Sequence, residues 1–430
     1  MWAGAGPFTA DDIRALDAYC RDRFIELAPN QNSFGHMERW LKHSRYRPLA
    51  ECPDGFRTPA GDWRDTPSTL DPTNPAALEL LAELYAELLP NFTSRRLNIG
   101  CDETWELGKG ASRAAVERLG LPRVYLDYLH QLKALAARHG CTALYWGDMV
   151  WNHFPDRLDL LDRGLIHVDW GYYKAYPFQE HGNKLKAAGL PFWFAPGTST
   201  WSTLLGCNEA AFGSNRSAAL AAPSCGAQGL LNTDWGDGGH WQYLPVSELG
   251  FAAGAAMAWC EKANPDAAIR AALDPQVYRD EAGVMGRAAY ALADTWQLVS
   301  ENATQASLLD RILREGFAHV LPPTVTPATL AAAEAHLESN LALMRGARMT
   351  RPDAELILAE FANNGRMALT ACKPGRMILA GDTGSAARAT RADDFETIVA
   401  EHRRLWLARN RPGGLPDSLR LFEDRLTDCR

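Results

Sequence analysis

The chain has 430 residues, 47% of them hydrophobic, and a formal net charge of −8. This acidic balance, with basic residues scattered rather than clustered, excludes a nucleic-acid partner. No apolar run approaches the ~20 residues needed to cross a membrane, so a membrane partner is not expected either. The hydrophobic content suffices for one large domain and a smaller one.

The nine cysteines are widely spaced and form no CxxC pair. This spacing is typical of reduced thiols rather than disulfides or a zinc site. The 11 histidines form no HxH or HxxxH pair, so we expect no metal and no cofactor. Residues 1–7 lack the charged and apolar regions of a signal peptide, which favours a cytoplasmic location.

Short apolar runs alternate with helical patterns over residues 1–264. Helices are predicted over 11–23, with Thr9 as the N-cap, over 74–89 and within 111–139. The strand-like runs are residues 24–29, 97–101, 142–146, 165–170, 192–196 and 229–233. Strands that alternate with helices at this spacing predict a parallel sheet. We therefore expect an α/β fold in which these residues form six strands of a TIM-type (β/α)8 barrel.

The strand signal stops near residue 264, and residues 265–430 are predicted to form a separate helical domain. Apolar residues recur there at i, i+3 and i+4, the spacing of amphipathic helices that pack against one another. The predicted helices are residues 276–300, 305–316, 327–346, 351–370 and 388–409. Breaks are expected at the Pro- and Gly-containing segments 322–323, 373–375 and 411–414.

Two adjacent acids, Asp102 and Glu103, follow the strand predicted over 97–101. In a (β/α) barrel the catalytic groups lie at the C-terminal ends of the strands. Successive strand residues point to opposite sides, so we expect the two carboxylates to differ in direction and role. The alternative is that the pair merely begins a helix, with Asp102 as its N-cap.

The other predicted strands end in aromatic and acidic residues beside glycines. These residues are Trp146, Asp148, Trp170, Tyr172, Tyr173, Trp201, Asp234 and Trp235. Aromatic rings stack on the apolar faces of sugars, and carboxylates accept hydrogen bonds from sugar hydroxyls, so the pattern predicts a carbohydrate site. The alternative for any single tryptophan is that it fills the barrel core.

Glycosidic bonds are usually cleaved by two carboxylates that flank the bond. Two acids that are neighbours on one strand do not flank a bond in this way. The spacing therefore favours a mechanism in which the substrate supplies its own nucleophile, such as an N-acetyl group steered by one carboxylate.

The segment Asn98-Ile99-Gly100-Cys101-Asp102-Glu103 resembles the His/Asn-x-Gly-x-Asp-Glu signature of glycoside hydrolase family 20, the β-N-acetylhexosaminidases. The form of the signature with a cysteine before the acid pair resembles that of the family's hexosaminidase D-like branch. Further segments resemble the family's strand ends over roughly residues 8–262. These are Pro29 with Gly35-His36, Trp146-Gly147-Asp148, and Asp169-Trp170-Gly171-Tyr172.

The resemblance implies removal of a terminal β-linked N-acetylhexosamine by a substrate-assisted retaining mechanism. This family is one of the exceptions to the rule that two carboxylates cleave the bond. It implies that Glu103 is the general acid/base, with a pKa raised by an aromatic pocket. Asp102 would orient the 2-acetamido group and stabilise the charged intermediate. Tyr172 or Tyr173 would hydrogen-bond the acetamido oxygen, and His36 would tune Glu103 from behind. The pocket wall would comprise Trp146, Trp170 and Trp235.

In that family, residues 24–29 would correspond to the third barrel strand. The first two strands, with a sugar-binding Arg and the Asp that pairs with the His, would then be missing. We therefore expect a barrel truncated to about six strands and weak activity. A hydrolase of another glycoside and a sugar-binding protein without turnover remain open alternatives. The choice between GlcNAc and GalNAc, the leaving group and the oligomeric state are also open.

Overall fold

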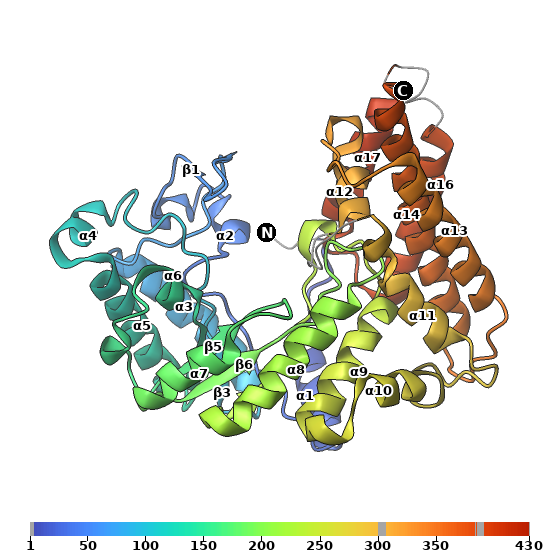
Figure 1. Ribbon diagram of the computed structural model, residues 1–430. Coiled ribbons are helices and arrows are strands. Elements are labelled where there is room, and N and C mark those ends of the chain that lie inside the picture. The colour runs from blue at the N-terminus through green and yellow to red at the C-terminus, as the bar shows by residue number, and fades with distance from the viewer. Residues whose placement is uncertain (1–3, 300–306, 383, 385–390, 430) are drawn as a thin grey trace.

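The computed structural model describes residues 4–299, 307–382, 384 and 391–429. A five-stranded parallel sheet forms the centre of the N-terminal half, in the order β3-β4-β5-β6-β7 (Figure 1). The strands are β3 (Arg96–Asn98), β4 (Thr142–Trp146), β5 (Ile166–Trp170), β6 (Phe192–Ala195) and β7 (Gly229–Leu230). Five of the six predicted strands are thus confirmed, and their sequential order gives a half-barrel in which each strand pairs with the next.

The strand predicted over residues 24–29 is wrong. Phe24 lies in a turn after the first helix with φ of 58°, and its side chain is 100% exposed. The Phe24 side chain has no sheet surface to pack against, so the apolar run that begins with it does not form a strand. The chain joins the sheet at Pro29, whose carbonyl accepts the Asn98 N–H at 3.0 Å. Asn30 then bridges Asn98 in parallel, and Gln31 N–H donates to the Asn98 carbonyl at 2.9 Å.

Helices cover the sheet because the chain alternates between strands and helices. Thr9 caps α1 (Ala10–Arg21) in a capping box with Asp12, as predicted, and Asn74 caps α3 (Pro75–Leu88). The remaining helices of this half are α2 (Glu38–Leu41), α4 (Arg113–Leu119), α5 (Leu121–Arg138), α6 (Asp148–His153), α7 (Phe178–Ala187), α8 (Asn208–Cys225) and α9 (Leu244–Cys260). A short hairpin, β1 (Phe56–Arg57) and β2 (Trp63–Arg64), precedes α3.

The C-terminal half is helical, as predicted, and its long helices stand together on the side away from α4 and α5 (Figure 1). They are α10 (Asp266–Ala272), α11 (Met285–Ala293), α12 (Leu308–Glu315), α13 (Pro327–Met344), α14 (Ala354–Ala380), α16 (Ala392–Arg409) and α17 (Leu415–Cys429). The helix predicted over 276–300 is divided, because a π-helical turn (Leu273–Tyr278) precedes α11. Residues 300, 305–306 and 388–390 of the predicted helices lie outside the described residues.

The break predicted at residues 373–375 is also wrong, because α14 continues through Pro374 to Ala380. A proline removes one helical hydrogen bond, but burial can outweigh that cost. Pro374 and Gly375 are buried, and a Cβ on Gly375 would lie 3.0 Å from Leu330 of α13. Close packing between α13 and α14 therefore holds the helix together across the proline. The predicted breaks at 322–323 and 411–414 do separate helices.

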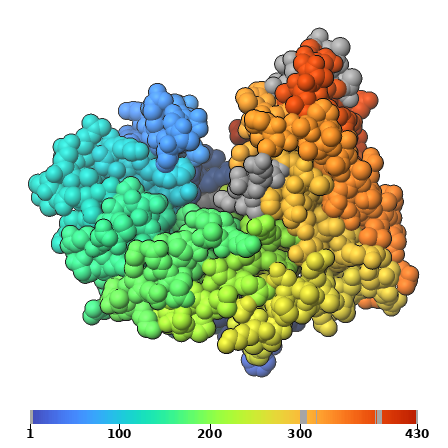
Figure 2. All heavy atoms as spheres, in the orientation of Figure 1, coloured from blue at the N-terminus to red at the C-terminus, as the bar shows by residue number. Residues whose placement is uncertain are grey.

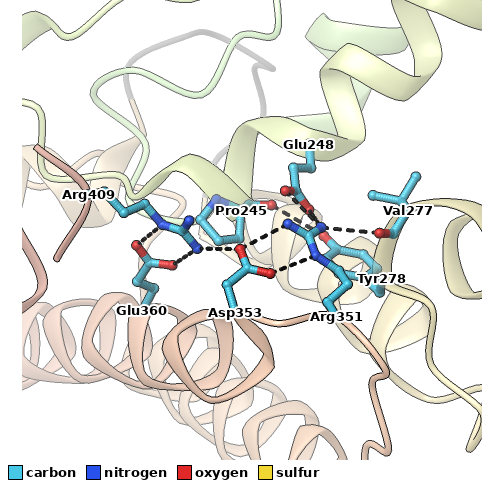
Figure 3. A network of polar contacts seen from close by, with 8 residues as sticks. All are labelled: Pro245, Glu248, Val277, Tyr278, Arg351, Asp353, Glu360 and Arg409. Carbon is cyan, nitrogen blue, oxygen red and sulfur yellow. Dashed lines mark hydrogen bonds and ion pairs between the residues drawn. The ribbon is translucent and has the colours of Figure 1, made fainter.

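A partly buried network of charges joins the two halves (Figure 3). Arg351, which precedes α14, binds Glu248 of α9 at 2.8 Å and Asp353 at 3.0 Å. Arg409 at the end of α16 binds both Asp353, at 3.1 Å, and Glu360. The network lies across the boundary predicted at residue 264, and one hydrophobic core contains residues from both sides of it. The C-terminal helices are therefore firmly attached to α9.

Within the described ranges, none of the helices combines the length and apolar character that a membrane span requires.

Candidate active site

The acid pair lies in a run of unusual backbone conformation beyond the end of β3. Gly100, Cys101 and Glu103 have φ of 70°, 76° and 48°, in the left-handed region that non-glycine residues rarely adopt. The alternation of a strand therefore does not extend to these residues. Asp102 and Glu103 do not point to opposite sides of the sheet, because both line the same cavity. Their difference in role stays a prediction.

His36 lies between the two acids. Its Nε2 atom is 3.2 Å from Asp102 Oδ2 and 3.4 Å from Glu103 Oε2. The approach of the two segments requires the glycine before it, since a Cβ on Gly35 would lie 2.2 Å from the Asp102 carbonyl oxygen. The hydrogen bond to Asp102 raises the pKa of His36 to about 9, against the opposing effect of burial. The imidazole is therefore a cation at neutral pH and lies between the two acidic side chains.

The surroundings of Glu103 raise the pKa of its carboxyl group. Burial raises the pKa of its carboxyl group above the ordinary value, while the charge of His36 works against this rise. Asp102 and Asp237 raise the pKa further, and Arg64 lowers it. A carboxyl group with a raised pKa at the edge of a cavity is suited to general acid catalysis.

Asp148 lies behind the acid pair rather than in the cavity wall. Its Oδ2 accepts the backbone N–H of Glu103 at 3.0 Å, and its Oδ1 accepts Trp170 Nε1–H at 3.4 Å. Burial, followed by the charge of Asp102, raises the pKa of Asp148 to about 7. This carboxyl group therefore fixes the backbone of one cavity residue and the ring of another.

The cavity has a volume of about 360 Å³ and an aromatic wall. The rings that line it are those of Trp146, Trp170, Tyr172, Trp201 and Trp235. Trp170 stacks on Tyr172 with 5.1 Å between ring centroids, and Trp201 meets Tyr172 edge-on at 4.9 Å. Trp235 Nε1–H donates to the Tyr172 hydroxyl at 3.1 Å. These rings contact one another around the cavity, and Trp146 also belongs to a small hydrophobic core with Leu144 and Val168.

Besides Asp148, two residues predicted for the site lie outside the cavity lining. Tyr173 is 47% exposed and meets Tyr176 edge-on at 5.5 Å. Asp234 accepts hydrogen bonds from the hydroxyls of Thr200 at 3.0 Å and Ser247 at 2.9 Å, and also from Thr198. The carboxylate of Asp234 is therefore used within the protein.

Three polar residues line the cavity that the sequence analysis did not select: Asn30, Asn32 and Asp237. Asn30 and Asn32 lie in the segment that pairs with the end of β3, so the strand-end rule applied to that segment would have found them. Asp237 follows Trp235 by two residues, but nothing in the sequence distinguishes it from Asp234.

The C-terminal helices hold the loop that carries Trp235 and Asp237. In this loop, residues 235–243, Ser418 of α17 donates its hydroxyl to the Gly239 carbonyl at 2.5 Å. Asn364 of α14 donates to the Trp241 carbonyl at 2.8 Å, and the Trp241 ring stacks on Phe422 at 3.9 Å. One wall of the cavity is therefore positioned by the helical half of the chain.

No group of three or more His, Cys, Asp or Glu side chains suited to a metal ion occurs among the residues the structure describes. The groups that do converge are an ionisable acid pair, a cationic imidazole and a cage of aromatic rings. This arrangement can donate and accept protons beside a ligand ring that stacks on the aromatic wall.

Comparison with known proteins agrees with this chemistry. Residues 3–209 match the family model of the glycosyl hydrolase family 20 catalytic domain. Hexosaminidase D of Homo sapiens is 31% identical over 140 residues, which cover 31% of this chain and 26% of that protein. Beta-hexosaminidase A of Caenorhabditis briggsae is 24% identical over 173 residues, covering 37% of this chain and 29% of that protein. The matches thus span only a minor part of these relatives' own lengths.

A chitobiase from Flavobacterium johnsoniae is similar in structure, with a TM-score of 0.48 and 16% identity over 96% of this chain and 68% of the other. The family match contains the acid pair, His36 and the wall from Trp146 to Trp201. Over these residues, the chain is similar to the catalytic domain of glycosyl hydrolase family 20.

Proposed function

We propose that this protein removes a terminal β-linked N-acetylhexosamine from a carbohydrate by a substrate-assisted, retaining mechanism. The observation that carries the proposal is the convergence of Asp102 and Glu103 on one cavity with an aromatic wall. The match of residues 3–209 to the glycosyl hydrolase family 20 catalytic domain supports the same chemistry, as do the raised pKa of Glu103 and the cationic His36. The roles of the individual residues below are part of the proposal.

In the first step, Glu103 donates its proton to the glycosidic oxygen while the acetamido oxygen of the substrate attacks the anomeric carbon. The bond to the leaving group breaks, and a cyclic oxazolinium ion forms. Asp102 accepts a hydrogen bond from the acetamido N–H and stabilises the positive charge. The Tyr172 hydroxyl, oriented by Trp235, donates to the acetamido oxygen.

In the second step, the Glu103 carboxylate takes a proton from water, and the water oxygen attacks the anomeric carbon from the face that the leaving group vacated. The ring of the intermediate opens, and the product keeps the β configuration. Two displacements at one carbon restore the original stereochemistry, and Glu103 ends the cycle protonated. The cation of His36 lies 3.2 Å from Asp102 Oδ2 and holds this carboxyl group in place.

The half-barrel supports a finer architectural proposal. We infer that β3 to β7, with the edge segment at Asn30, are six consecutive strand positions of a (β/α)8-type barrel, followed by a helical domain from about residue 265. Within the described residues, the two edges of this sheet are not paired with each other. This opening favours a second candidate function, a sugar-binding protein without turnover.

One assay separates the two functions. The purified chain is incubated with nitrophenyl N-acetyl-β-glucosaminide and, in parallel, with nitrophenyl β-glucoside, which lacks the acetamido group. Substrate assistance requires hydrolysis of the first and almost none of the second. Equal rates would contradict substrate assistance, whereas saturable binding of N-acetylglucosamine without release of nitrophenol would support the sugar-binding alternative.

A further inference from the structure

The loop of residues 235–243 is a thin wall with open space on both of its sides. Trp235 and Asp237 line the active-site cavity, whereas Gly236, Gly239 and His240 line a cleft of about 530 Å³. Figure 2 shows the orange and red C-terminal helices across a hollow from the blue and cyan lobe. Three of the nine loop residues are glycines, which lose more conformational freedom on folding than other residues. Bonds from the rest of the chain must therefore hold this wall in place.

A line of polar side chains connects this loop to three C-terminal helices. Asn363 Nδ2 of α14 lies 3.0 Å from the Tyr243 hydroxyl, which lies 2.8 Å from Nδ1 of His402 on α16. The other ring nitrogen of His402, Nε2, is 2.8 Å from the hydroxyl of Ser418 on α17, which donates to the Gly239 carbonyl. All four side chains are buried, so each bond that is lost leaves a polar group without a partner.

The direction of donation along this line is fixed at both of its ends. The Arg366 guanidinium, which can only donate, lies 3.0 Å from Asn363 Oδ1. The amide N–H groups of Asn363 are therefore the ones that face Tyr243. At the other end the Gly239 carbonyl can only accept, so the single hydroxyl hydrogen of Ser418 points to it.

These two ends determine the tautomer of His402. Since the Ser418 hydrogen is used for Gly239, the Ser418 oxygen must accept a hydrogen from Nε2. A neutral ring then has no hydrogen on Nδ1, which accepts the Tyr243 hydroxyl hydrogen. The Tyr243 oxygen in turn accepts from Asn363. Every donor and acceptor along the line is thus satisfied by one arrangement.

A cationic ring does not fit the same arrangement. It would carry a second hydrogen on Nδ1, and the buried Tyr243 hydroxyl would lose its acceptor. Burial, followed by the charge of His240, lowers the pKa of His402 to about 4. The neutral ring is therefore the form present at neutral pH.

The two loop positions that this line reaches are joined to the cavity wall. Gln242, next to Tyr243, donates its side-chain amide to the Trp235 carbonyl at 2.7 Å. His240, next to Gly239, donates its backbone N–H to the Asp237 carbonyl at 3.2 Å. A displacement of Tyr243 or Gly239 would therefore be passed on to the residues that line the cavity.

We propose that His402 is a positioning residue for the cavity wall formed by Trp235 and Asp237, and that it acts as the tautomer protonated on Nε2. Its ring joins the end of the loop, at Tyr243, to Ser418 and through it to Gly239. The helical half thereby sets the position of one wall of a cavity whose acid pair belongs to the half-barrel. The inference concerns the loop itself, and only its expected effect on sugar binding rests on the proposed function.

Two variants separate the two ring nitrogens. The amide of His402→Asn reaches the place of Nδ1 and can accept from Tyr243, but it leaves Ser418 without a donor. The amide of His402→Gln reaches the place of Nε2 and can still donate to Ser418. The matched control is His336→Asn on α13, which removes a 2.8 Å bond to the Ala291 carbonyl and leaves the loop contacts intact.

Hydrogen–deuterium exchange of residues 235–243, followed by mass spectrometry, reads the loop directly. Exchange should rise about two- to tenfold in His402→Asn, the effect of losing one hydrogen bond. It should stay near the natural rate in His402→Gln and in His336→Asn. Equal exchange in the two His402 variants would overturn the inference, because loss of packing alone would affect both.

The tautomer can be measured without a variant. In nitrogen-15 NMR of the natural protein with labelled histidines, His402 is identified by its proximity to the rings of Trp406 and Phe422. At neutral pH its Nδ1 should give the signal of a nitrogen that carries no hydrogen. A hydrogen on Nδ1 would overturn the inference even if His402→Asn did not fold.

A binding measurement keeps the inference separate from the proposed function. Calorimetry with N-acetylglucosamine should give a Kd raised about two- to tenfold in His402→Asn and nearly unchanged in His402→Gln. If the natural protein does not bind this sugar while the exchange differs as predicted, the proposed function fails and the role of His402 stands. If the exchange does not differ, the role of His402 fails whatever the affinity for the sugar.

Discussion

The backbone N–H of Glu103 donates to Oδ2 of Asp148 at 3.0 Å. The backbone of the proposed proton donor, which has a φ of 48°, is thus held by a carboxyl group from the end of the neighbouring strand. Non-glycine residues in this region cost about 1–3 kcal/mol and persist only where the surroundings enforce them. The buried Asp148 supplies part of that enforcement, and it orients Trp170 through its second oxygen.

Replacing Asp148 by alanine should therefore lower both stability and activity. The buried N–H of Glu103 would lose its acceptor, at a cost of about 1–3 kcal/mol in the free energy of unfolding. Urea denaturation measures this cost, and Asp148→Asn is the matched control because its amide oxygen can still accept the hydrogen bond. If alanine were as stable as asparagine here, the proposed anchoring would be incorrect.

The charge of His36 should set the alkaline limit of activity. The imidazole of His36, whose pKa is raised to about 9, is positively charged at neutral pH and opposes the rise in the pKa of Glu103. Glu103 must be protonated to act, so kcat/KM falls as pH rises through its pKa. In His36→Asn the opposing charge is gone, the pKa of Glu103 rises further, and the alkaline limb moves to higher pH.

The pH profile of kcat/KM measures this displacement, with His130→Asn on α5 as the control. A limb that moves to lower pH in His36→Asn would contradict the assigned electrostatics.

Substrate assistance predicts tight binding of a thiazoline analogue of the cyclised intermediate. Analogues of such states bind about 10²–10⁸-fold more tightly than substrates. Asp102→Asn should lose most of this advantage, because the amide carries no charge to stabilise the cationic ring. Inhibition constants for the analogue and for N-acetylglucosamine give the comparison. A covalent glycosyl-enzyme trapped on any side chain would refute the mechanism.

Ser418 should influence the active site from a distance. Its hydroxyl donates to the Gly239 carbonyl and lies 2.8 Å from His402 Nε2. In Ser418→Ala both groups lose this partner, which should lower the free energy of unfolding by about 1–3 kcal/mol. The loop with Trp235 should also move, raising KM more than it lowers kcat. Ser339→Ala, on the exposed face of α13, is the control. A purely structural role would leave KM as it is.

Strands β4 and β5 could be predicted from the sequence because their apolar runs coincide with buried positions on both faces. The segment over residues 24–29 has a similar pattern, but its apolar residues include the fully exposed Phe24. Whether a run of apolar residues becomes a strand depends on whether another segment lies beside it. That information is not local, and the same holds for the break expected at Pro374, which packing against α13 overrides.

The chemistry of the site was predictable, but its geometry was not. The strand-end rule correctly located Asp102, Glu103 and the tryptophans of the wall. The directions of the two carboxylates depend on the left-handed conformation of Cys101 and Glu103, which residue types do not specify. Asp234 and Asp237 are equally acidic in sequence, and only the hydroxyls around Asp234 show that Asp237 is the one that lines the cavity.

The central claim is that Glu103 protonates the leaving group of an N-acetylhexosaminide. The most direct measurement is the turnover rate of a β-linked N-acetylglucosamine disaccharide by the natural protein and by Glu103→Gln, with folding checked by circular dichroism. Loss of a general acid costs about 10²–10⁴ in rate, and the loss should be greatest for a sugar leaving group, which departs poorly without a proton. We predict a decrease of this size with an unchanged fold. A Glu103→Gln protein that cleaves the disaccharide at nearly the natural rate would contradict the account.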